Sequence, residues 1–322
     1  MLQVPYPLSE EEKVHYLKRI FASRKTSKTR DYFQGWLLIT TLKTILIYRK
    51  NTVEANHSTS KVHFEGDDLI IKDGKATITI YSVPEAREIV DVLSYRKEGY
   101  EKVVQNYLAR GHISSARALL RKAPKEIQAT ETYARAFAET SFLSFSPVSE
   151  DVLSPIKRHK ELFQARNSAV RRDYTSIEEL VYFIKPPEAH LYWAMASYGI
   201  ILSSEEGTKR SRSTLKTAGR ILARNLRKSI SHFSKLELVE KFLLVDFINT
   251  EIKDKITGNL VMKLARKLTK EENPYLRTAA AGIYLRNEMK EKAREVLTEL
   301  FQEDLEEELF MKCVELLRGA NL

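Results

Sequence analysis

The chain has 322 residues with a single cysteine, Cys313, which excludes an internal disulfide framework and favours a reducing, cytoplasmic setting. Hydrophobic residues make up 43% of the sequence and charged residues 30%, a composition typical of a globular protein with one large core or two ordinary ones. The longest apolar runs, residues 35–48 and 191–202, are too short for a transmembrane helix. The start MLQVPYPLSEEE predicts no signal peptide. High charge with few Gln or Cys residues is typical of thermophile proteins.

The net charge of +10 is distributed unevenly along the chain. Lys and Arg exceed Asp and Glu by three in residues 1–99, by two in residues 100–150 and by seven in residues 151–230, whereas acids exceed bases by two in residues 231–322. Because the excess is local, it calls for a local partner rather than a general effect on solubility.

The first predicted element is a helix over residues 9–22. Ser9 and Glu12 have the spacing of a capping box, and apolar residues follow at helical intervals. Residues 24–30 then hold four basic residues among Ser and Thr, which indicates a solvated linker or, alternatively, a contact with an anion.

Residues 36–81 have the period and composition of β-strands. Segments 36–40, 44–48, 62–64, 69–71 and 76–81 are rich in β-branched and aromatic residues, and Asp73-Gly74 is a strong hairpin signal. A helix follows at Pro84-Glu85, with Ala86, Ile89, Val90 and Leu93 on one apolar face. We therefore expect residues 1–98 to form a small α+β module of a helix, about five antiparallel strands and a closing helix.

This strand run, from Gly35-Trp36-Leu37-Leu38-Ile39-Thr40 through Ile45-Leu46-Ile47-Tyr48 to a helix with Ala86 and Leu93, resembles the pleckstrin-homology-like domains of the GRAM type. The resemblance implies a module that docks on membrane lipids or on proteins. That family has roughly seven strands, whereas about five are predicted here, and a helix is predicted where its first strands would be.

From Tyr100 onward the sequence has helical periodicity, interrupted by short breakers such as Pro124, Pro186-Pro187 and Asn273-Pro274. A repeat lies within it, because five residues recur 177 positions later. The first copy holds Tyr107, Leu108, Ala116, Arg117 and Leu120, and the second holds Tyr284, Leu285, Ala293, Arg294 and Leu297.

The repeated unit, two helices with a break between them, resembles a tetratricopeptide repeat. Gly111 fits the family pattern at the break, but Glu288, its equivalent in the second copy, does not. The resemblance implies a protein-binding scaffold. We therefore expect residues 99–322 to form a mainly α-helical solenoid of helix hairpins.

The strongest charge signal is a basic helix after Gly207. No Asp or Glu occurs between Gly207 and Leu236, and the basic residues fall on one side of a helix whose other side is apolar. Because like charges four residues apart destabilise a helix, an anionic partner is expected to offset them. The predicted binding residues are Lys209, Arg210, Arg212, Lys216, Arg220, Arg224, Arg227 and Lys228.

The sequence leaves the identity of that anion open. We interpret the protein as a non-enzymatic scaffold that binds an acidic protein surface through this helix. The alternative is a nucleic-acid-binding protein that uses the same face on duplex DNA or structured RNA. Stacking on single-stranded bases is poorly supported, because no aromatic residue is interleaved between Lys209 and Ile230. The aromatic residues Tyr182, Phe183, Tyr192, Trp193 and Tyr198 are interpreted mainly as helix core.

An acidic stretch near the end of the chain offers a third partner, another copy of the protein bound head to tail. No phosphate loop, nucleophile elbow or paired cysteine motif occurs, so we expect no catalytic residues, no cofactor and no metal site. The third functional alternative is an enzyme whose site carries none of these motifs. The acidic stretch comprises Glu303, Asp304, Glu306, Glu307 and Glu308.

Overall fold

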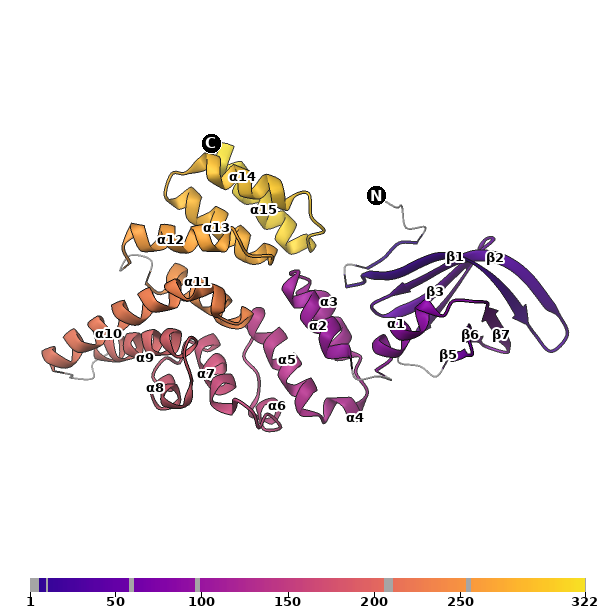
Figure 1. Cartoon of the computed structure of the whole chain (residues 1–322), viewed down its shortest axis with the longest axis horizontal. Coiled ribbons are helices and arrows are strands. Elements are labelled where there is room, and N and C mark those ends of the chain that lie inside the picture. The colour runs from indigo at the N-terminus through magenta and orange to yellow at the C-terminus, as the bar shows by residue number, and fades with distance from the viewer. Residues whose placement is uncertain are drawn as a thin grey trace. The chain divides into compact units, whose positions relative to one another are not determined.

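The computed structural model describes residues 6–9, 11–57, 61–95, 99–205, 211–252 and 256–321. The chain divides into two compact units, Met1–Tyr107 with Ser114–Tyr133, and Leu108–Ile113 with Ala134–Leu322. A curled antiparallel sheet lies in the first unit, and the C-terminal part is helical (Figure 1). The expected fold class, an α+β N-terminal module followed by a mainly α-helical region, is therefore confirmed.

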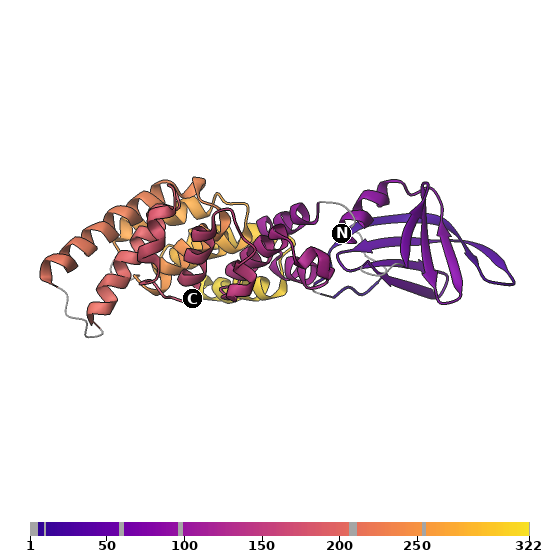
Figure 2. The ribbon, with the colours of Figure 1, turned by 90° about the horizontal axis from the view of Figure 1, so that it is seen from below.

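Seven strands in the described part of the first unit form one antiparallel sheet, in the order β4-β3-β2-β1-β7-β6-β5. The central strand β1 pairs with β2 along its length and with β7 through residues 22–25, so it belongs to both halves of the sheet. Figure 2 shows how strongly the strands curl and cross. The strands are β1 (Val14–Lys25), β2 (Arg30–Thr40), β3 (Lys43–Tyr48), β4 (Asn51–Asn56), β5 (Val62–Glu65), β6 (Asp68–Asp73) and β7 (Ala76–Ile80).

The helix predicted over residues 9–22 is wrong, because residues 14–25 form β1. The capping-box contacts do form, since Ser9 Oγ donates to Glu12 Oε2 at 3.1 Å. However, Thr40 Oγ1 donates to the other carboxylate oxygen of Glu12 at 2.8 Å, which ties this residue to the end of β2. Pairing with the long, β-branched and aromatic strand β2 overrides the local helical pattern. This correction, together with the polar edge strand β4, accounts for seven strands where about five were expected.

The predicted hairpin and closing helix are both present. Gly74 lies between β6 and β7 with a φ of +59°, the left-handed conformation that such a turn requires. Helix α1 (Glu85–Leu93) contacts β1 and buries three of the four residues of the expected apolar face, Ala86, Val90 and Leu93, whereas Ile89 is half-buried.

Helices α2 (Tyr100–Ala109), α3 (Ile113–Arg121), α4 (Lys125–Gln128) and α5 (Glu131–Leu143) follow α1. The second compact unit, which we call the helical unit, holds most of α5 and then α6 (Glu150–Leu153), α7 (Lys160–Val170), α8 (Ile177–Leu180), η1 (Val181–Phe183), α9 (Ala189–Glu205), α10 (Arg212–Ser231), η2 (Phe233–Lys235) and α11 (Leu238–Thr250). It ends with α12 (Gly258–Leu268), α13 (Pro274–Arg286), α14 (Lys290–Leu300) and α15 (Glu307–Asn321).

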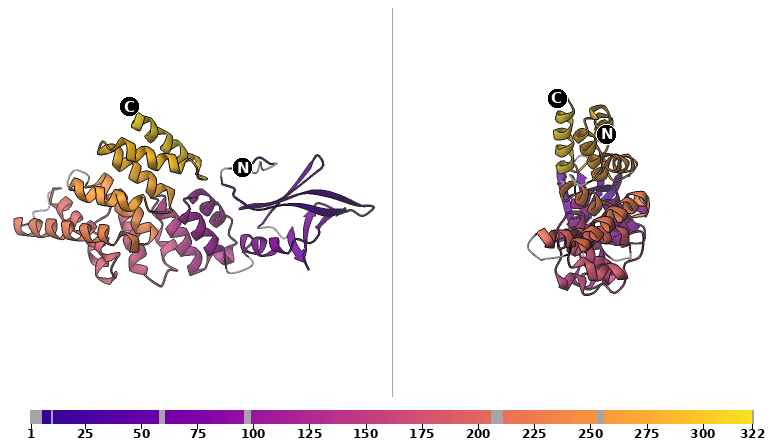
Figure 3. Two further views of the ribbon diagram at one scale, coloured as in Figure 1. Left: turned by 45° about the horizontal axis from the view of Figure 1, so that its top comes forward. Right: turned by 90° about the vertical axis from the view of Figure 1, so that its left-hand side faces the viewer.

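Packing in the helical unit follows chain order in part. Helices α12 to α15 pack consecutively, and their stack is visible in yellow and orange in Figure 3. Helix α11 instead contacts α7, α9 and α13. The long helices α9 and α10 pack closely along each other, as Figures 1 and 2 show. This pair carries the predicted basic face.

Both copies of the sequence repeat form two helices around a short break, and the break has the same backbone form in each. Gly111 has a φ of +79°, and Glu288, at the equivalent position, has a φ of +59°. Glu288 therefore adopts a conformation that glycine favours. The first break also packs against the start of α13, because Asn273 Nδ2 donates to the carbonyl of Leu108 at 2.8 Å.

Candidate anion-binding face and adjoining groove

Helix α10 begins at a well-formed cap. Ser211 Oγ accepts a hydrogen bond from the backbone N–H of Thr214 at 3.1 Å, which satisfies one of the free donors at a helix N-terminus. Ala218, Leu226 and Ile230 are buried on the inner side of the helix. This apolar side fixes the rotation of α10 and leaves the opposite side to solvent.

The predicted basic residues of α10 lie on that opposite side. Lys209 and Arg210 lie outside the described residues. Among the others, Lys228 is half-buried and the remaining five are exposed. We call this set the basic ridge, and its members are Arg212, Lys216, Arg220, Arg224, Arg227 and Lys228.

The ridge cations have no carboxylate partner among the described residues. Ion pairs occur elsewhere in the helical unit, such as Arg172 with Glu251 at 2.9 Å and Lys241 with Glu271 at 2.6 Å. Within the described part of the chain, no Asp or Glu carboxylate pairs with a member of the basic ridge. The ridge is thus a line of cations about 24 Å long at the rise of an α-helix, and no carboxylate of the described residues compensates it.

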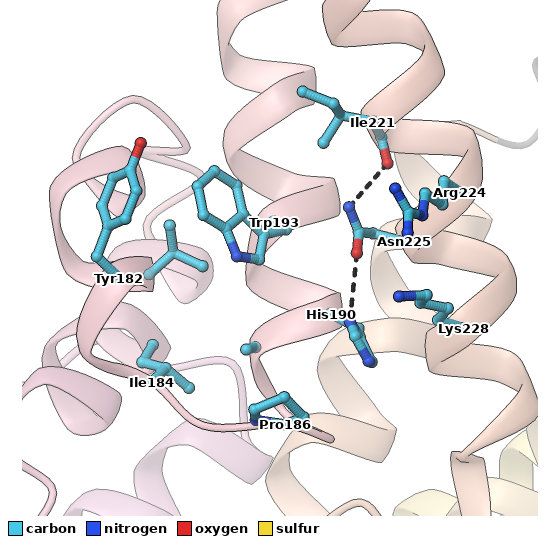
Figure 4. Close-up of a pocket in the computed structure, with 11 residues that line it drawn as sticks. Tyr182, Ile184, Pro186, His190, Trp193, Ile221, Arg224, Asn225 and Lys228 are labelled. Carbon is cyan, nitrogen blue, oxygen red and sulfur yellow. Dashed lines mark hydrogen bonds between the residues drawn. The ribbon is translucent and has the colours of Figure 1, made fainter.

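A groove of about 480 Å³ adjoins the ridge, between α10, α9 and the segment that begins at η1 (Figure 4). We call it the α9–α10 groove. One side is apolar and aromatic, and Arg224 and Lys228 of the ridge form the other side. Its lining residues are Val181, Tyr182, Ile184, Pro186, Ala189, His190, Trp193, Ile221, Arg224, Asn225 and Lys228.

The aromatic side of the groove is built by two residues from different elements. The rings of Tyr182 and Trp193 lie 4.9 Å apart between centroids and are nearly perpendicular, at 85°. Such an edge-to-face pair holds both rings in defined orientations. Tyr182 is nevertheless 70% exposed, so the pair is open to a ligand.

Two polar side chains of the groove, Asn225 and His190, bond to each other. Asn225 Nδ2 donates to the carbonyl of Ile221 at 3.0 Å, so its Oδ1 faces His190 Nδ1, 3.2 Å away, and accepts from it. Burial lowers the pKa of His190, and the nearby charge of Lys228 lowers it further. His190 is therefore held neutral near pH 7, and the positive charge of the groove comes from Arg224 and Lys228.

The sequence interpretation of the aromatic residues is only half right. Tyr192 and Tyr198 are buried, as expected for helix core. Tyr182 and Phe183 are 70% and 71% exposed, and Trp193 lines the groove. No aromatic residue lies between the basic residues in sequence, but folding brings Tyr182 and Trp193 to Arg224 and Lys228. Pro186-Pro187, which ends the short segment carrying Tyr182, is the one local signal that this segment departs from a regular helix.

The acidic stretch near the C-terminus is engaged in part within its own unit. Glu303 pairs with Arg277, and Tyr275 donates to Glu306 at 3.3 Å. Asp304 lies 3.9 Å from His112. Glu307 and Glu308 remain exposed at the start of α15. A head-to-tail contact would therefore have to compete with these internal partners.

No described helix combines the length and apolar character needed to cross a bilayer. Comparisons with protein-family models, with curated proteins and with solved structures find no significant match to this chain.

Proposed function

We propose that the protein is a non-enzymatic scaffold that binds an acidic protein surface through the basic ridge. The observation that carries the proposal is the set of cations on the exposed side of α10 for which the described part of the chain supplies no carboxylate partner. Lys216, Arg220 and Arg224 lie at successive i,i+4 positions, where like charges cost about 0.2–0.5 kcal/mol per pair. An acidic partner offsets that cost when it binds.

Two resemblances support a docking role. The repeat around Gly111 and Glu288 resembles a tetratricopeptide unit, which implies a protein-binding scaffold. In the N-terminal module, a seven-stranded antiparallel sheet followed by helix α1 is compatible with the expected pleckstrin-homology-like architecture. A single buried cysteine, Cys313, supports a cytoplasmic location.

The alternative is a nucleic-acid-binding protein that uses the same ridge, because arginine-rich surfaces also suit phosphate. The two functions differ in their ligands. Duplex DNA or structured RNA would be bound with an affinity that falls steeply with salt, roughly in proportion to the number of phosphates contacted.

A charge-reversal experiment tests the proposal. The ridge variant Arg220→Glu, Arg224→Glu, Arg227→Glu is compared with a control, Lys50→Glu, Lys61→Glu, Lys75→Glu, which makes the same change at exposed positions of the sheet module. Both proteins and the wild type are used to capture partners from native extract, and are titrated with a 20-base-pair duplex and an RNA hairpin. We expect an acidic protein to bind the wild type and the control but not the ridge variant. Loss of nucleic-acid binding alone would favour the alternative, and equal capture by all three would refute both.

A further inference from the structure

The α9–α10 groove has two chemically different sides that a single ligand must satisfy together. The apolar side includes Tyr182, Ile184 and Trp193, and the cationic side consists of Arg224 and Lys228 (Figure 4). No carboxylate from the described part of the chain lines the groove. A complementary ligand therefore brings both an apolar group and negative charge.

The apolar side is formed before any ligand arrives. Trp193 is on the long helix α9, which packs against α10 along its length, and Tyr182 is fixed edge-on against it. A volume of about 480 Å³ accommodates one large side chain together with the backbone around it. Pockets of this kind, in which aromatic residues surround a central anchor, carry most of the binding energy in protein interfaces.

The cationic side continues directly into the basic ridge. Arg224 and Lys228 are one helical turn apart, and Arg220 is one turn further along the same face. An acidic segment that follows the ridge would thus pass the mouth of the groove. Carboxylates on both sides of an anchored side chain could reach these cations.

The groove fits a peptide better than a nucleotide. The rings of Tyr182 and Trp193 are at 85°, so they do not form two parallel faces between which a base could stack. The polar edge of a base would need both donors and acceptors, but His190 Nδ1 and Asn225 Oδ1 are already bonded to each other, and Arg224 and Lys228 only donate. Much of the remaining lining is aliphatic, with Val181, Ile184 and Ile221 among it.

We propose that the α9–α10 groove is the anchor site for one bulky apolar side chain of an acidic peptide segment, whose flanking Asp or Glu residues bind Arg220, Arg224 and Lys228. This inference rests on the proposed function and adds to it the kind of partner sequence. The ridge supplies attraction for any acidic surface, whereas the groove selects segments with a Phe, Leu or similar residue among the acids.

Two fluorescein-labelled synthetic peptides test the inference by fluorescence anisotropy. Both have eleven residues, ten of them Glu or Asp, and the central residue is Phe in one and Ser in the other. We expect the Phe peptide to bind the wild-type protein at least tenfold more tightly, a difference of about 1.4 kcal/mol, because it buries a large apolar side chain that the Ser peptide lacks. Tyr182→Ser and Trp193→Ala should remove most of this difference and leave the weaker binding of the Ser peptide unchanged. Phe183→Ser is the matched control, because Phe183 is as exposed as Tyr182 but does not line the groove.

Tryptophan emission gives a second readout. The chain has two tryptophans, so Trp36→Phe leaves Trp193 as the sole reporter. For this measurement both peptides are used without the fluorescein label. The Phe peptide should shift the emission of Trp193 to shorter wavelength, and the Ser peptide should not.

The outcomes separate the inference from the function on which it rests. Equal affinity for the two peptides, with both lost in the ridge variant, would refute the groove as an anchor and leave the acidic-partner function standing. No binding of either peptide would remove the support for both. A shift of Trp193 emission by AMP or by oligo(dT), at concentrations at which the Phe peptide gives none, would also overturn the inference in favour of a nucleotide ligand.

Discussion

Arginine is used in two opposite ways within the helical unit. Arg166 on α7 is 1% exposed, and its guanidinium donates to both carboxylate oxygens of Glu240, at 2.7 and 2.8 Å. Glu237 lies 2.5 Å away and Glu139 3.6 Å away. The arginines of the basic ridge are exposed and have no carboxylate partner within the described residues.

The difference follows from solvation. A charge that is removed from water must be matched by charges and hydrogen bonds of the protein, or the fold loses several kcal/mol. A charge that stays in water needs no internal partner, so its placement is free to serve something outside the chain. The carboxylates around Arg166 show that the fold supplies acids where a cation is buried. Along α10, where the cations stay in water, the described part of the chain supplies no such acids.

The largest expected effect on stability comes from removing the carboxylate that pairs with the buried Arg166. Glu240→Ala leaves the guanidinium of Arg166 and the hydroxyl of Tyr192 without their shared acceptor. We expect the free energy of unfolding to fall by about 3–5 kcal/mol, as measured by urea denaturation. Glu237→Ala is the control, because the side chain of Glu237 is 60% exposed, and it should cost less than about 1 kcal/mol. Similar losses from both changes would contradict the account.

Reversing the charge of one ridge residue should raise the stability of the protein instead of lowering it. Arg220 has Lys216 and Arg224 at four residues on either side, so Arg220→Glu replaces two repulsive pairs with two attractive ones. We expect the free energy of unfolding to rise by about 1 kcal/mol at low salt, summed from 0.2–0.5 kcal/mol per pair. The gain should shrink in 1 M NaCl because exposed charges are screened. Lys75→Glu on the sheet module is the control, and a loss of stability from Arg220→Glu would show that the ridge has an internal partner.

The smallest expected effect is a shift in the pKa of His190, which lies in the groove and responds to the charge of the neighbouring ridge. Lys228→Gln removes a cation that lowers the pKa of His190, so that pKa should rise toward its ordinary value, without reaching it because burial is the larger cause. The folded-state pKa is depressed, so the unfolded chain binds the proton more tightly, and stability falls as pH drops below about 6.5. NMR titration of the imidazole measures the shift. Lys216→Gln should leave it unchanged, and an equal shift in both variants would mean that His190 does not distinguish Lys228 from the rest of the ridge.

Much of the fold could be predicted from local patterns in the sequence. Helical periodicity, the Asp73-Gly74 turn and the apolar face of α1 are all set by residues within a few positions of one another, and all were found. Strand β1 could not be predicted in this way. The contact between Thr40 and Glu12 spans 28 residues, and it is tertiary pairing that makes residues 14–25 extended.

The same limit applies to the candidate site. The basic ridge lies on one helix, so its spacing along the sequence indicated a single charged face. The groove beside it is made by α10, by α9 and by the segment at η1, and Tyr182 is more than 40 residues from Arg224. Aromatic residues in helical sequence are usually buried, and nothing local distinguishes Trp193 from its buried neighbour Tyr192.

The pairing of β1 with β7 has a consequence for synthesis of the protein. Ala22 is the partner of Ile80, so the two halves of the sheet are joined by residues 58 positions apart. The chain must emerge from the ribosome to beyond Ile80 before β1 can pair with β7. The α13–α14 hairpin, in contrast, joins helices that are neighbours in sequence, so it can form as soon as it emerges. During translation the N-terminal module therefore passes through a stage in which the backbone N–H and C=O groups on one edge of β1 are unpaired. At this stage the module would gain most from a chaperone that binds nascent chains.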